Sequence, residues 1–212
     1  MIQRSAKILF VVMGLFGLQL LALKASAWLW PITGETFKGI GLANLLFYGP
    51  CLIALLVFHL AFRPQAKFRW IPGRHAFRGW KLIILLLGLL GTCAFYWPAI
   101  GRLLSGPGPV WSLTLIGGAL VAPVIEEWIF RGVVWEQIKP SGNTDHLWSV
   151  IALLITSVMF GLWHLPFAVR SPLLVHIGFG LLMGLVRWRT GALLPGIVLH
   201  AIGNALQVMS QA

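Results

Sequence analysis

The sequence predicts an all-α fold, a polytopic transmembrane bundle of about seven helices with a polar cavity inside the membrane. Of the 212 residues, 58% are hydrophobic and only 10% are charged, a balance far outside the range of soluble globular domains. Apolar windows of about 20 residues, each long enough to cross a bilayer, recur along the chain. A few ionisable residues lie inside these windows, where such groups usually face a bundle interior or a water-filled cavity.

The predicted spans cover most of the chain. They run approximately over residues 8–30, 40–61, 82–100, 110–138, 147–169, 172–188 and 192–209. The fourth window is long, and Pro123 inside it removes a helix hydrogen bond, so we expect a break there. Because no separate soluble domain is visible, we predict a single transmembrane domain over residues 1–212, of which 1–105 are generic membrane helices.

The basic residues predict the orientation in the membrane. Between the second and third spans lie only basic and no acidic charges: Arg63, Lys67, Arg69, Arg74, Arg78 and Lys81. The positive-inside rule makes this connection cytoplasmic. Alternation then places the amino terminus, Lys139, Arg187 and Arg189 on the cytoplasmic side, and the carboxyl terminus outside. We expect a multi-pass integral protein of a bacterial cell (inner) membrane.

The formal net charge of +11 does not indicate a nucleic-acid partner. The 16 Lys and Arg residues are scattered between apolar spans, and they do not form one polar face interleaved with aromatic residues. Charges in this arrangement set the topology and contact anionic lipid. The sequence therefore favours the lipid bilayer over nucleic acid as a partner.

Two of the five acidic residues stand side by side in the fourth span, Glu126 and Glu127. Glu127 and Arg131 are four residues apart, so they share a helix face and can form an ion pair. Glu126 points about 100° away, and its neighbour one turn later is Phe130, which cannot neutralise it. Glu126 therefore needs a partner from another segment, which makes it a functional candidate.

Polar residues also lie within the fifth and seventh spans. His200 and Asn204 are four residues apart on one helix face, and both can donate hydrogen bonds toward a common point, as a developing oxyanion requires. A carboxylate beside an imidazole, here Glu126 and His164, can activate a water molecule. The positions of these residues along their spans lead us to expect that they meet in one layer of the bundle.

Together these residues form three motifs in chain order. The motifs are EExxxR at Glu126, Glu127 and Arg131, FxxxH at Phe160 and His164, and HxxxN at His200 and Asn204. The pattern resembles the CPBP family, also called the ABI or type II CAAX protease family of glutamic intramembrane proteases. The resemblance covers roughly residues 110–209, which we expect to be a CPBP-like catalytic core. It implies an intramembrane endopeptidase that hydrolyses a peptide bond of a membrane-associated protein or peptide.

Residue by residue, the resemblance implies that Glu126 is the general base and that His164 helps it hold the attacking water. It implies that His200 and Asn204 stabilise the tetrahedral oxyanion. It assigns structural support of the site to Glu127, Arg131 and Phe160. No metal and no cofactor are expected in such a mechanism.

Two alternatives stay open. Glu126, His164 and His200 could bind zinc as a catalytic ligand set, but the sequence has no HExxH motif and Asn204 suits an oxyanion better than a metal. The metal-free mechanism is therefore preferred. Glu126, Glu127, His164 and His200 could instead line the pathway of a transporter or proton relay, or the protein could be an immunity-type membrane protein without catalysis. The paired halves that many carriers show are absent.

The sixth span carries weaker signals. His176 is interpreted as a packing or hydrogen-bonding residue. Gly180 and Gly184 form a GxxxG pattern, which permits close helix contact. Neither feature is given a part in the chemistry.

Overall fold

The computed structural model describes residues 14, 17, 69–73, 83, 86–88, 90, 92, 115–139, 145–165 and 172–211. The predictions for the first three spans lie outside these ranges, apart from a few isolated residues. The part described is almost entirely helical and has no named strand, so the all-α prediction is confirmed for it. Judged by length and composition, α8 (His146–His164) and α9 (Leu173–Thr190) can each cross a membrane.

Backbone contacts divide the chain into two compact units. The first comprises Met1–Phe62, Tyr96–Ile125 and Ala201–Ala212, and the second comprises Arg63–Phe95 and Glu126–His200. The second unit holds all the motif residues except Asn204.

The fourth predicted span is a run of four helical segments without a gap. They are η2 (Leu115–Val121), α6 (Ala122–Glu127), η3 (Trp128–Val134) and α7 (Trp135–Ile138), in which π-helical and α-helical turns alternate. The expected break at Pro123 is wrong, because this residue lies inside α6. What changes near the proline is the hydrogen-bond pattern, from π to α. Such π-helical insertions are frequent at functional sites.

Helix α8 exposes large apolar side chains along one face. Asp145 caps its start, because the side chain accepts a hydrogen bond from the Leu147 backbone N–H at 2.9 Å. Its exposed residues include large apolar ones at helical spacing: Leu147, Val150, Leu154, Val158 and Leu162. Its buried face carries the polar residues Ser149, Thr156 and Ser157 together with two large aromatic residues, Phe160 and Trp163. An apolar outer stripe of this kind suits contact with lipid.

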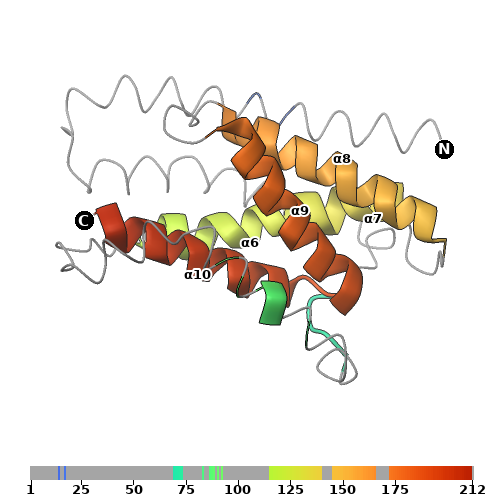
Figure 1. The fold of residues 1–212 in the computed structure, drawn as a ribbon, viewed down its shortest axis with the longest axis horizontal. Coiled ribbons are helices and arrows are strands. Elements are labelled where there is room, and N and C mark those ends of the chain that lie inside the picture. The colour runs from blue at the N-terminus through green and yellow to red at the C-terminus, as the bar shows by residue number, and fades with distance from the viewer. Residues whose placement is uncertain are drawn as a thin grey trace. The chain divides into compact units, whose positions relative to one another are not determined.

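Helices α8 and α9 lie side by side (Figure 1). At Gly180 the two backbones approach so closely that a Cβ atom would lie 3.0 Å from the Ser157 Cα. The GxxxG pattern therefore does mark a close helix contact. α9 ends at Thr190 and is capped by Gly191, whose positive φ of 67° suits glycine in a left-handed cap.

Two connections that the charge pattern places on the same side of the membrane meet in the structure. The backbone N–H groups of Leu193 and Leu194 donate to the carbonyls of Arg69 and Trp70 at 3.1 and 2.9 Å. Trp70 also packs edge-on against Trp128 of η3, with ring centroids 5.3 Å apart. The connection after span two is thus tied to η3 and to the start of α10 (Leu194–Gln211).

Candidate active site

Glu126 lies in the last turn of α6 and is only 1% exposed, so it does not face lipid. Its Oε2 atom lies 3.6 Å from Nε2 of His164 on α8 and 3.7 Å from Nε2 of His200 on α10. The structure therefore brings together one carboxylate and two imidazoles from three helices. Both distances exceed that of a direct hydrogen bond and are short enough for one water molecule to bond to both partners.

Glu127 is held by a different set of partners. Its Oε1 atom accepts a hydrogen bond from Nη1 of Arg131 at 3.1 Å and lies 3.2 Å from Nδ1 of His200. Arg131 is fully buried and uses Nη2 to donate to the Gly180 carbonyl at 2.8 Å. The guanidinium thus links the fourth span to α9, while Glu127 links it to α10.

Phe160 packs at the centre of this cluster. The Arg131 guanidinium carbon lies 4.7 Å from the centroid of its ring, a distance typical of a cation–π contact. The same ring lies 4.4 Å from the His164 ring and 5.6 Å from the His200 ring, centroid to centroid. Because Phe160 is 1% exposed, its ring excludes water from one side of both imidazoles.

His164 has a defined tautomer in its neutral form. Its Nδ1 atom lies 2.8 Å from the Phe160 carbonyl oxygen, which can only accept a hydrogen bond, so Nδ1 carries the proton. Nε2 is then an acceptor and faces Glu126. The His164 side chain is 19% exposed while that of Glu126 is 1% exposed, so His164 stands on the more open side of the pair.

Helix α9 contributes more to the site than its sequence indicated. The His176 ring stacks on the His164 ring, and the Phe179 ring lies edge-on to the His200 ring at 5.1 Å. The Gly180 carbonyl accepts the bond from Arg131. One face of α9 carries His176 and, three and four residues later, Phe179 and Gly180. This spacing was the feature of the sequence that could have indicated their common role in the site.

A second buried ion pair was also missed. Nη2 of Arg187 donates to Oε1 of Glu136 at 2.8 Å, and Nε of Arg187 donates to the Arg131 carbonyl at 3.0 Å. Arg187, which the charge pattern placed at the cytoplasmic end of its span, lies in the last turn of α9 and is only 6% exposed. The signal was Glu136 in the same predicted span as Glu126, since a buried carboxylate requires a cation nearby.

Asn204 belongs to the first unit. Its side-chain Nδ2 donates to the Gly118 carbonyl at 2.8 Å. It follows His200 by four residues in α10. In the described part of the chain, no three His, Cys, Asp or Glu side chains are grouped in a way that could hold a metal ion.

Residues 108–206 match the model of a family described as type II CAAX prenyl endopeptidase Rce1-like. The match covers just under half of the chain and is consistent with the CPBP, or CAAX protease, family. The resemblance to the CPBP, or CAAX protease, family that three motifs predicted is thereby confirmed. No curated protein and no solved structure matches the chain significantly.

The Rce1-like segment contains every motif residue from Glu126 to Asn204. The family match supports a CAAX-type intramembrane protease, a hydrolase with a membrane-associated protein as substrate. The apolar outer face of α8 agrees with an integral membrane protein.

Proposed function

We propose that this protein is a glutamic-type intramembrane endopeptidase that hydrolyses a peptide bond of a membrane-associated protein or peptide. In this proposal residues 1–212 form one transmembrane domain of about seven helices with a polar cavity, and residues 110–209 are its catalytic core. The domain lies in a bacterial cell membrane with its amino terminus in the cytoplasm. The observation that carries the proposal is the buried Glu126 carboxylate with His164 and His200 at 3.6 and 3.7 Å.

Glu126 and His164 are suited to hold and activate one water molecule. Oε2 of Glu126 and Nε2 of neutral His164 are both acceptors, so a water that lies beside the two atoms can donate one hydrogen to each. The water oxygen then keeps its lone pairs for attack on the carbonyl carbon of the substrate. As the new C–O bond forms, Glu126 takes one proton from the water, and the carbonyl oxygen becomes an oxyanion. When the C–N bond breaks, Glu126 gives this proton to the leaving amine.

His200 is suited to stabilise the oxyanion as an imidazolium. Its Nδ1 faces the Glu127 carboxylate, so Nδ1 is a donor, and Nε2 can also donate only if the ring is doubly protonated. In this proposal the ring donates from Nδ1 to Glu127 and from Nε2 to the oxyanion.

Asn204 is the second oxyanion donor in this proposal. It lies one helical turn after His200, and the resemblance to CPBP proteases implies this role. Its bond to the Gly118 carbonyl orients the amide before any substrate binds. Donors that are oriented in advance stabilise developing charge without a cost of reorganisation during the reaction.

A substrate survey with matched variants tests the proposal. Carboxyl termini of membrane proteins are compared by mass spectrometry between cells that produce the full-length chain and cells that produce Glu126→Ala or His164→Ala. We expect new termini only with the unmodified chain. His146→Ala is the matched control, because His146 is an exposed histidine at the other end of α8. Unchanged cleavage in the Glu126→Ala protein would exclude the proposed mechanism.

The same preparations separate the alternatives. Zinc hydrolysis predicts stoichiometric zinc in the active protein and loss of cleavage with a chelator, whereas the glutamic mechanism predicts cleavage that a chelator does not change. A transporter, proton relay or immunity-type protein predicts no new carboxyl termini with any variant. A prenylated substrate ending in a CAAX motif would be recognised in the survey by its new terminus at the modified cysteine.

A further inference from the structure

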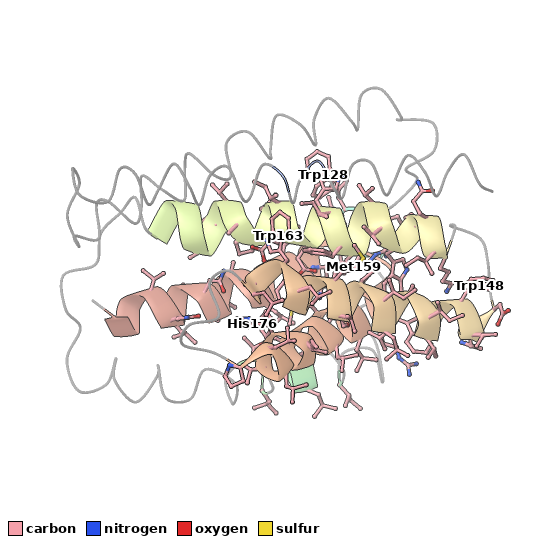
Figure 2. The ribbon with its side chains drawn as sticks, turned by 90° about the horizontal axis from the view of Figure 1, so that it is seen from above. Trp128, Trp148, Met159, Trp163 and His176 are labelled. Carbon is pink, nitrogen blue, oxygen red and sulfur yellow. The ribbon has the colours of Figure 1, made fainter. Side chains whose placement is uncertain are left out.

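His176 contacts the candidate catalytic residue His164 face to face. The two ring centroids are 4.6 Å apart, and the ring planes differ by 10°. Figure 2 labels His176 on α9, and His164 belongs to the neighbouring helix α8. Parallel aromatic rings at this separation attract one another. The contact therefore couples the orientation of one imidazole to the other across two helices.

One hydrogen bond does not by itself orient His164. The bond from Nδ1 to the Phe160 carbonyl holds one edge of the ring, but the last torsion of a histidine side chain is broad. The ring also stands on the more open side of the site, where it is 19% exposed. His176 stacks on its face and limits rotation about this torsion. Nε2 of His164 thereby stays directed at Glu126.

The rest of α9 is held independently of His176. Phe179 packs on His200, the Gly180 carbonyl accepts from Arg131, and Arg187 pairs with Glu136. A substitution at position 176 can therefore remove the stacked ring without moving the helix.

We propose that His176 is a positioning residue whose flat ring holds His164 in the orientation that the hydrolysis of a peptide bond requires. The inference rests on the proposed function. It assigns the effect to the shape of the ring, and it gives the ring nitrogens of His176 no role in proton transfer.

Two substitutions in the full-length chain distinguish ring shape from ring nitrogens. His176→Phe keeps a flat ring and removes the nitrogens, whereas His176→Leu removes the flat ring and keeps an apolar side chain. We expect the kcat of the His176→Leu protein to fall about tenfold with an unchanged KM, since a small misplacement of a catalytic group has effects of this order or larger. The kcat of the His176→Phe protein should stay close to that of the unmodified protein. Rates are measured on a substrate identified by the survey of carboxyl termini.

Nitrogen NMR of histidine-labelled protein gives a readout that does not depend on activity. The His164 signal is assigned by its loss in the His164→Ala protein. We expect a single tautomer of His164 in the unmodified and His176→Phe proteins, and averaged tautomers in the His176→Leu protein.

The outcomes separate the inference from the proposed function. Equal kcat values for the Phe and Leu variants, whether high or low, would overturn the positioning role while the Glu126→Ala result still supports the protease. Cleavage that persists in the Glu126→Ala protein would instead remove the proposed function. In that case the nitrogen spectra alone decide whether His176 orients His164, and identical spectra for the two variants would overturn it.

Discussion

Two buried carboxylates of the same helical run, Glu126 and Glu136, are held in different ways. Glu136 meets Arg187 at 2.8 Å, the length of a charge-assisted hydrogen bond. Glu126 meets two imidazoles at 3.6 and 3.7 Å, beyond direct bonding distance. A guanidinium stays protonated, so the Glu136 pair has no proton to exchange, whereas an imidazole can both accept and donate one. The first arrangement ties helices together, and the second is suited to proton transfer.

The largest expected effects come from removing each charge in turn. Glu126→Gln should lower the rate of cleavage about 100- to 10,000-fold, the usual contribution of a general base, while the protein stays folded. Glu136→Gln should instead cost about 3 kcal/mol of stability, because it leaves the buried Arg187 charge uncompensated. Initial rates per folded molecule and thermal unfolding in detergent measure the two effects. The assignment of a structural role to Glu136 and a catalytic role to Glu126 is wrong if the folded Glu136→Gln protein cleaves as slowly as the Glu126→Gln protein.

A smaller effect is expected when both partners of the structural pair are replaced. The double substitution Glu136→Leu with Arg187→Met removes both charges, so most of the stability lost in Glu136→Gln should return. About 1 kcal/mol should stay lost, because Arg187 also donates to the Arg131 carbonyl. The free energy of unfolding of the single and double variants measures this recovery. A double variant as unstable as Glu136→Gln would show that the two side chains stabilise the protein by more than the neutralisation of each other's charge.

The smallest expected change concerns the close contact of α8 and α9 that supports Arg131. Gly180→Ala should cost about 1–3 kcal/mol of stability, because its Cβ would lie 3.0 Å from the Ser157 Cα and would force the helices apart. Gly178→Ala is the matched control on the same helix, where a Cβ would meet nothing within 4 Å. There alanine should stabilise the helix by about 0.5–1 kcal/mol. Equal unfolding temperatures for the two variants would contradict this interpretation of the contact.

Spans four to seven could be predicted closely because hydrophobic length is a local property of the chain. The described helices Leu115–Ile138, His146–His164, Leu173–Thr190 and Leu194–Gln211 lie within the predicted windows or a few residues from their ends. The pairing of Glu127 with Arg131 follows from helical spacing in the same way. The need of Glu126 for a partner from elsewhere could also be inferred, because no cation lies on its face of the helix.

The role of α9 could not be inferred in this way. Its spacing shows that His176, Phe179 and Gly180 share a face, but nothing in it says which neighbour that face meets. Arg187 illustrates the same point, since a basic residue near a span end is ordinarily a topology charge. Only the approach of Glu136 from another helix makes it half of a buried ion pair.

The amino-acid sequence by itself indicated a membrane protein, the positions of the described helices from Leu115 onward and the candidate residues for chemistry, because each depends on hydrophobicity or on spacing within one helix. Only the tertiary structure decided that Glu127 contacts His200 as well as Arg131 and that α9 contributes to the cluster. It also placed the Glu126 carboxylate within 3.7 Å of two imidazole rings. The reason is physical: the rotation of each helix about its axis is set by how its side chains pack against other helices, and that packing is a property of all of them together.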